Sequence, residues 1–123
     1  GDSAKAGEIE DRLIDFAVRI IKLADALPDT PAGKHNRGSC SDQEFSSTEY
    51  AEARGAESNT DFVHKLKTAL KELNETSVWL RMVCRAELMK QDLLETLIDE
   101  NQQLCRIVNA SIKTVKSKLI AKR

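Results

Sequence analysis

Residues 60–88 read TDFVHKLKTALKELNETSVWLRMVCRAEL, and this stretch decides the fold class. Its apolar residues recur every three or four positions, which is the period of an α-helix. One stripe contains Phe62, Leu66, Ala69, Leu73, Leu80 and Cys84, and Val63, Leu70, Trp79, Met82, Val83 and Ala86 widen it. Asn59 or Thr60 is suited to cap the N-terminus. The stretch therefore predicts one long amphipathic helix.

Three further segments extend the helical pattern on both sides. Residues 9–27 have the same apolar period, and a proline follows them. Pro31 and Gly33 are expected to keep the chain out of regular structure to about residue 40. A helix is predicted over 42–54, with a frayed first half, and another from about residue 91 to 119. No segment alternates with the period of a β-strand.

These segments predict an all-α fold, an up-down-up-down four-helix bundle that forms a single domain over residues 9–120. Residues 1–8 are expected to be disordered or derived from an expression tag, because the chain begins with Gly1. Residues 121–123 are expected to form a basic C-terminal tail. We expect burial of Phe16, Ile20, Leu66, Leu73, Trp79, Leu80, Ile98, Val108 and Ile112. The apolar stripes of the first and third predicted helices, over residues 9–27 and 60–88, are broader than one bundle needs, which predicts an oligomer.

The composition excludes several classes of protein. Hydrophobic residues make up 41% of the chain and charged residues 32%, so the chain can bury a core, unlike a disordered protein. Aromatic residues are 4%, too few for a platform that stacks single-stranded bases. No apolar run reaches the roughly 18 to 20 residues of a membrane span, and the polar N-terminus is unlike a secretory signal. We expect a cytoplasmic protein with free thiols and no membrane partner.

Charge is distributed unevenly along the chain. All 20 Asp and Glu residues lie in the first hundred positions. The remaining segment contains basic residues and no acidic ones: Arg106, Lys113, Lys116, Lys118, Lys122 and Arg123. Cations near a helix C-terminus complement the helix dipole and aid solubility, which is one interpretation. The other is a surface that binds nucleic acid phosphates, strengthened if an oligomer places several copies together.

The residues offer little for catalysis. A di-iron site in a helix bundle needs Glu-x-x-His pairs on two helices. Asp61 and His64 have this spacing, but the only other histidine, His35, lies in the predicted link. Cys84 has no histidine near it in sequence, and the chain has no Gly-rich phosphate loop or nucleophile elbow. We therefore expect a protein that is not an enzyme and holds no metal or cofactor.

Three stretches resemble a known family. They are YAEARGAESNTDFVHKLKTALKELNETSVWLR at residues 50–81, DFAVRIIKLADALPDTPAGKH at 15–35 and LCRIVNASIKTVKS at 104–117. They are similar to the bacterial four-helix-bundle proteins encoded in intervening sequences of large-subunit ribosomal RNA genes, which are often described as ribosomal-protein-like. Residues 38–48, GSCSDQEFSST, depart from the family pattern, which is usually apolar and basic there.

The resemblance implies a ring-like homopentamer. It also implies kinship with the accessory variability determinant of diversity-generating retroelements, which binds nucleic acid and engages a reverse transcriptase. The first of these stretches, residues 50–81, is called the family block. Its polar residues would form a network between the second and third predicted helices: Glu52, Arg54, Ser58, Lys65, Glu72 and Glu75. The leading functional prediction is a non-enzymatic oligomeric scaffold for RNA or DNA. The alternative is a protein-interaction scaffold that binds no nucleic acid.

Overall fold

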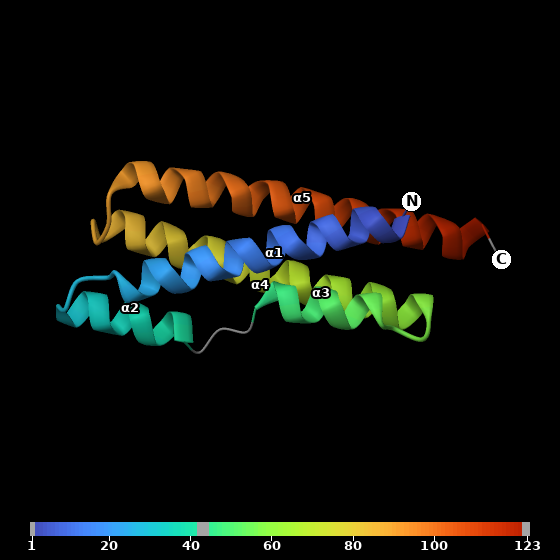
Figure 1. Cartoon of the computed structure of the whole chain (residues 1–123), viewed down its shortest axis with the longest axis horizontal. Helices are drawn as coiled ribbons and strands as arrows, with labels where there is room; N and C mark the ends of the chain where they lie inside the picture. Colours follow the sequence, from blue (N-terminus) through green and yellow to red (C-terminus); the bar gives the residue numbers. More distant parts are fainter. Residues whose placement is uncertain (1, 42–44, 122–123) are drawn as a thin grey trace.

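The computed structural model describes residues 2–41 and 45–121, which form five α-helices and no strand (Figure 1). The helices are α1 (Asp2–Asp25), α2 (Pro31–Ser41), α3 (Ser46–Arg54), α4 (Asn59–Arg85) and α5 (Gln91–Ala121). The prediction of an all-α protein is confirmed, whereas five helices are present in the described ranges and four were expected.

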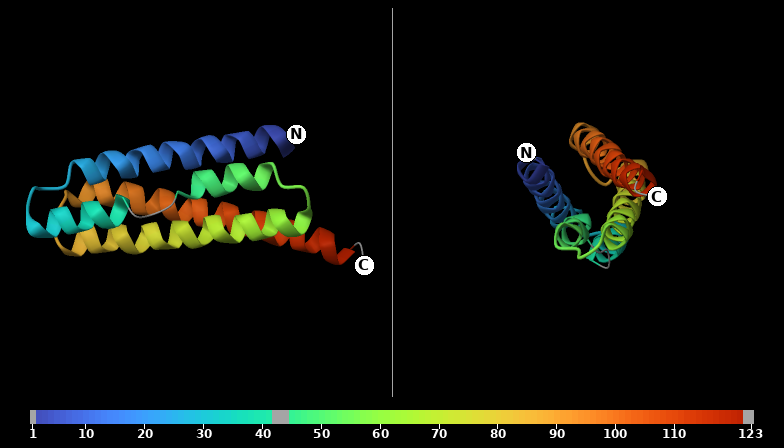
Figure 2. Two further views of the ribbon diagram at one scale, coloured as in Figure 1. Left: turned by 90° about the horizontal axis from the view of Figure 1, so that it is seen from below. Right: turned by 90° about the vertical axis from the view of Figure 1, so that its right-hand side faces the viewer.

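The three long helices run along the molecule, and α2 and α3 follow one another between α1 and α4 (Figure 1, Figure 2). Helix α4 packs against α5 on one side and α3 on the other, while α1 contacts α2, α3 and α5. The short helices α2 and α3 together therefore lie where the prediction placed one helix over residues 42–54 between the first and third helices.

Residues 31–41 form helix α2, so the prediction of an irregular link there was wrong. Pro31 is the first helical residue. The N–H of a residue at this position has no acceptor within the helix, so a proline there loses no hydrogen bond. The Oγ1 of Thr30 accepts a hydrogen bond from the backbone N–H of Gly33 at 3.1 Å. The carbonyl of Thr30 accepts from the N–H of Lys34 at 2.8 Å. Thr30 and Pro31 thus start a helix, as an N-cap and first-turn residue do.

Helix α2 lies tightly against the end of α1. A Cβ atom on Gly33 would overlap the backbone carbonyl of Pro28, so glycine is required for this close approach. Arg37 donates from Nη2 to the carbonyl of Leu27 at 2.6 Å and from Nε to that of Ala24 at 3.3 Å. Its guanidinium therefore satisfies carbonyls at the C-terminal end of α1 and complements the helix dipole.

Other helix ends also differ from the predictions. Helix α1 begins at Asp2, so residues 2–8 are helical where disorder was expected. Helix α3 begins at Ser46, and residues 42–44 of the predicted helix lie outside the described residues. Helix α4 is capped by Ser58, whereas the sequence predicted Asn59 or Thr60 as the cap. The Ser58 Oγ accepts a hydrogen bond from the backbone N–H of Asp61 at 3.1 Å.

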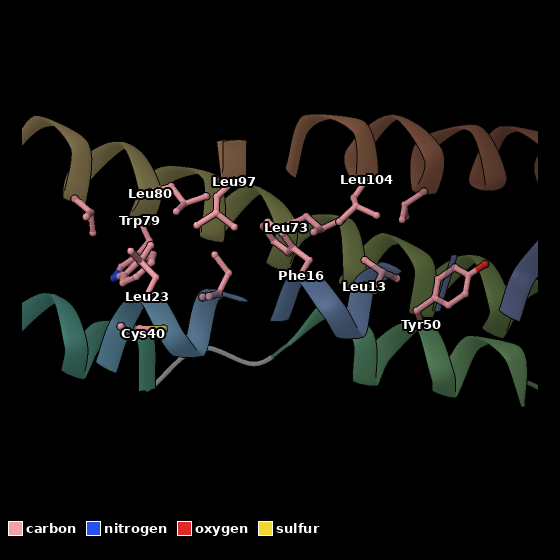
Figure 3. Packing of buried hydrophobic residues seen from close by; sticks show 14 of the residues in the cluster. Leu13, Phe16, Leu23, Cys40, Tyr50, Leu73, Trp79, Leu80, Leu97 and Leu104 are labelled. Atoms are coloured by element: carbon pink, nitrogen blue, oxygen red, sulfur yellow. The ribbon is translucent and has the colours of Figure 1, made fainter. Parts of the chain in front are cut away.

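The apolar core runs along the inside of the helices (Figure 3). Eight of the nine residues expected to be buried are buried, including Leu73 and Leu80 of α4, with exposed fractions of 1% and 0%. Ile98 is the exception, because it packs against the edge of the core and is only partly buried. The burial predicted from the helical period is therefore correct at eight positions and wrong at one.

Part of the broad apolar surface remains outside the core. Ile14, Val18 and Ile21 follow one another on α1 at helical spacing and are 44%, 42% and 43% exposed. On α4, Val78 and Met82 are 48% and 45% exposed. In the described part of the chain, no helix combines the length and apolar character needed to cross a membrane.

Candidate nucleic-acid interface

The C-terminal half of α5 presents several of the basic residues identified from the sequence. Arg106, Lys113, Lys116 and Lys118 are all exposed. Lys122 and Arg123 lie outside the described residues, so only four of the six predicted residues can be placed. Lys113 and Lys116 are three positions apart and therefore share a side of the helix.

Lys116 meets a second lysine from another helix. The neighbouring side chain of Lys67 on α4 lowers the pKa of Lys116 below its ordinary value, first through its close approach to the Lys116 side chain and then through its charge. Two ammonium groups held together repel one another, so the protonated form is disfavoured until an anion is present. Lys67 lies beside the basic residues of α5 although the sequence did not identify it, because it lies on a different helix.

Lys118 lies on the other flank of α5. A separation of two residues places it far around the helix from Lys116. It lines a pocket with Lys5 of α1, whereas Lys116 lies beside α4. The structure therefore divides the predicted basic residues between two surfaces.

We use the term basic face for the surface defined by Lys67 of α4 and by Arg106, Lys113 and Lys116 of α5. Beside Arg106, the seam between the two helices is hollowed into a groove of about 410 Å³, with polar lining residues that include Asn74, Ser77 and Gln102. Across this seam, the Cys105 Sγ and Asn74 Oδ1 atoms are 3.7 Å apart. Among the described residues, the groove lining contains no carboxylate. This surface is suited to an anionic partner.

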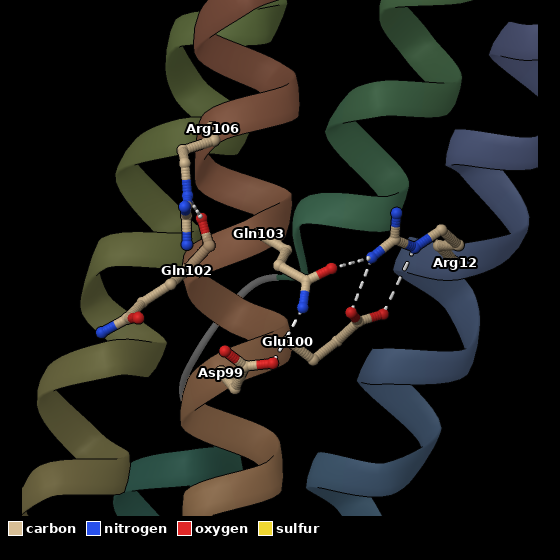
Figure 4. A network of polar contacts seen from close by, with 6 residues as sticks. All are labelled: Arg12, Asp99, Glu100, Gln102, Gln103 and Arg106. Carbon is tan, nitrogen blue, oxygen red and sulfur yellow. Dashed lines mark hydrogen bonds and ion pairs between the residues drawn. The ribbon is translucent and has the colours of Figure 1, made fainter.

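None of the four residues of the basic face makes an ion pair with another described residue. Arg106 donates from Nε only to the carbonyl of Gln102 in its own helix, at 3.4 Å. Two acidic residues of α5 have partners elsewhere (Figure 4): Glu100 binds Arg12 of α1 at 2.7 Å, and Asp99 accepts a hydrogen bond from Gln103 at 2.8 Å. The positive charge of the basic face is thus available for a ligand.

The polar residues of the family block occupy separate places. Lys65 of α4 binds Glu52 of α3 at 2.8 Å, which raises the pKa of Lys65. Arg54 instead approaches Glu10 of α1 at 3.4 Å. These two ion pairs connect α3 with α4 on one side and with α1 on the other. The sequence had instead predicted one network between the second and third helices.

Two of the other three residues of this block have local roles. Ser58 caps α4, as described above. Glu75 lies 4.0 Å from Lys71 in its own helix. Glu72 is buried, with 6% of its surface exposed. Five of the six residues therefore form ion pairs or a helix cap at separate places rather than a single site.

Within the described ranges, no group of three or more His, Cys, Asp and Glu side chains is placed to hold a metal ion. Asp61 lies in the first turn of α4, where a carboxylate stabilises the helix dipole. Burial raises the pKa of the thiols of Cys40 and Cys105, which keeps both protonated. These features favour structural roles for the side chains concerned.

Comparison with known proteins connects the fold to a family. Residues 46–110 match the family model described as 23S rRNA-intervening sequence protein. The chain is also similar to a protein of unknown function from the S23 ribosomal protein family of Bacteroides thetaiotaomicron VPI-5482. The two are 29% identical with a TM-score of 0.75, over 89% of this chain and 98% of the other. No match was found among curated proteins.

Proposed function

This chain belongs to the 23S rRNA-intervening sequence protein family, and on that premise we propose that it is a non-enzymatic protein that binds structured RNA through its basic face. The bound groups are backbone phosphates, so binding is largely independent of sequence. The face contains one lysine of α4 and three basic residues of α5, and these two helices pack against one another.

The contact between Lys67 and Lys116 carries this proposal. Like charges side by side in the free protein cost free energy, and a phosphate placed between them relieves the repulsion. In the part of the chain that is described, no carboxylate forms an ion pair with either lysine. Arg106 and Lys113 extend the positive surface along α5, where the described segment after residue 100 contains no acid.

Self-association would enlarge this surface. We propose that the chain forms a homopentamer, in which Ile14, Val18 and Ile21 of α1 are covered by a neighbouring copy. The exposure of these three residues supports an interface, because a continuous apolar stripe on a helix is usually covered by a partner. Repetition around a closed ring would multiply the charge of each basic face.

A second function is favoured by the same apolar stripe. If its partner is another protein rather than a second copy, the molecule acts as an interaction scaffold and needs no nucleic acid. A reverse transcriptase is one such partner in the retroelement proteins that the sequence resembles. Val78 and Met82, exposed on α4, would offer a further apolar contact.

RNA binding is tested by removing the pair of lysines that meet. In Lys67→Gln/Lys116→Gln, affinity for an RNA hairpin should fall, and the salt slope should decrease by up to about two units, about one for each lost phosphate contact. The matched control is Lys22→Gln/Lys90→Gln, which removes the same charge from exposed lysines away from the basic face. Fluorescence anisotropy over a salt series measures both quantities.

Equal losses in the two double variants would contradict a specific role for the basic face. Absence of binding to both hairpin RNA and duplex DNA at low salt would favour the interaction scaffold instead. Light scattering reports the assembly: Ile14→Asn/Val18→Asn should dissociate the oligomer, and a monomeric wild-type protein would refute the pentamer.

A further inference from the structure

A second ligand site is suggested by the pocket on the opposite flank of α5. This pocket has a volume of about 410 Å³ and is formed by α1, α3, α4 and α5, at the end of the molecule where α4 begins. Its size falls within the range of small-molecule sites. It is separate from the basic face, because its lining includes Lys118 and Lys5 but neither Lys67 nor Lys116.

The lining combines an apolar floor with hydroxyl groups. Ile9, Phe62 and Val115 contribute apolar surface, and all three are only partly buried against the core. The Ser111 hydroxyl donates to the carbonyl of Ile107 at 3.1 Å, and that of Thr114 to the carbonyl of Ala110 at 3.0 Å. Because each hydroxyl has a single proton, the two oxygens retain lone pairs that accept hydrogen bonds. The pocket thus suits a flat, largely apolar group that carries N–H donors.

The charge of the lining defines the rest of the ligand. Lys5 and Lys118 belong to the lining, which includes no acidic residue from the described part of the chain. Neither lysine makes an ion pair with any residue of the described ranges. A ligand with an anionic group at one end would be held by two ammonium groups.

We propose that this pocket binds one nucleotide with an amino-bearing base. The base lies against Phe62, its amino group donates to Ser111 and Thr114, and its phosphate binds Lys5 and Lys118. The nucleotide is either a free mononucleotide or an unpaired residue of an RNA strand, since both present the same chemistry. The site goes beyond the phosphate contacts of the basic face because it recognises a base.

Calorimetry with adenosine monophosphate tests the base contact. Purine riboside monophosphate is the matched ligand, since it lacks only the exocyclic amino group. In the wild-type protein, adenosine monophosphate should bind about three- to tenfold more tightly than the matched ligand. Ser111→Ala/Thr114→Ala should remove this difference, whereas Ser117→Ala, which alters an exposed hydroxyl outside the pocket lining, should preserve it.

The phosphate contact is tested with Lys5→Gln/Lys118→Gln, which should weaken binding of both nucleotides by about three- to tenfold. Lys67→Gln/Lys116→Gln should preserve the ratio of the affinities for adenosine monophosphate and purine riboside monophosphate, because the base does not contact the basic face, so failure of this site is distinguishable from failure of the basic face. A second comparison uses an RNA hairpin with one unpaired adenosine and the same hairpin with an abasic residue at that position. Tighter binding of the hairpin with the adenosine would identify an RNA strand as the source of the nucleotide.

Two results would overturn the proposal. One is equal affinity for adenosine monophosphate and ribose 5-phosphate, which would mean that the base is not bound. The other is the absence of saturable binding of adenosine monophosphate up to millimolar concentration together with equal affinity for the two hairpins. Preference for adenosine in either the free nucleotide or the hairpin, lost in Ser111→Ala/Thr114→Ala, supports it.

Discussion

The seam between α4 and α5 and the short helix α2 are stabilised in different ways. Along the seam, both helices contribute large apolar residues that are almost completely buried, such as Leu73 and Leu80 of α4 and Leu104 of α5. Helix α2 contributes Asn36 and Cys40 as its buried side chains. The first region depends on apolar area, and the second on a few specific contacts.

The contacts of α2 are directional. Thr30 caps its N-terminus, Arg37 binds carbonyls at the end of α1, and the Trp79 Nε1–H donates to the carbonyl of Asn36 at 2.8 Å. Each of these bonds requires one geometry, whereas apolar side chains in the seam can be exchanged for others of similar volume. A substitution in α2 should therefore be tolerated only where space is available.

The largest effect is expected at the seam. Leu73→Ala should lower the free energy of unfolding by about 2–5 kcal/mol, because it leaves a cavity where the side chain is 1% exposed. Urea denaturation followed by circular dichroism measures this. Leu93→Ala, at a position that is 43% exposed, is the control and should change stability by less than about 0.5 kcal/mol. Similar values for the two variants would mean that Leu73 lies at the periphery.

A pair of glycines in α2 tests the requirement for specific contacts. Gly33→Ala should destabilise the protein by about 1–3 kcal/mol, because the added Cβ overlaps the carbonyl of Pro28. Gly38→Ala should stabilise it by about 0.5–1 kcal/mol, since no atom lies within 4 Å of the added Cβ and alanine favours a helix. Thermal unfolding distinguishes the two. If both substitutions stabilise, α2 does not pack closely against α1.

The smallest effect concerns the bond that links the two regions. Trp79→Phe retains an aromatic ring but removes the donor to Asn36, which should cost about 0.5–1.5 kcal/mol. We expect amide hydrogen exchange in residues 31–41 to accelerate about two- to tenfold, while the α4–α5 seam retains its protection. Uniform acceleration along the whole chain would indicate that α2 does not open separately.

The sequence also contained a signal for α2 that was interpreted incorrectly. Thr30 followed by Pro31 is a typical start of a helix, with an N-cap and then a first-turn proline. The same Pro31 and Gly33 also favour a loop, because both residue types are common in loops, and that expectation is the one the structure overturns. Only the close approach of α2 to Pro28 explains why a glycine occupies a helical position here.

The sequence by itself determined the all-α fold, the long helices and most of the core. These depend on the helical period, which is a local property: a residue such as Leu66 or Val108 faces inward because its neighbours three and four positions away do. It also located the excess of basic residues after residue 100, since composition needs no structure.

Only the tertiary structure decided which charges meet. Lys67 and Lys116 are brought together, and Lys118 and Lys5 line one pocket, because of the rotation of α5 against α4 and α1. Arg54 of α3 pairs with Glu10 of α1 because the packing of these two helices brings the side chains together. The relative rotation and register of helices depend on how side chains interlock across their contact, and no pattern within a single helix specifies that packing.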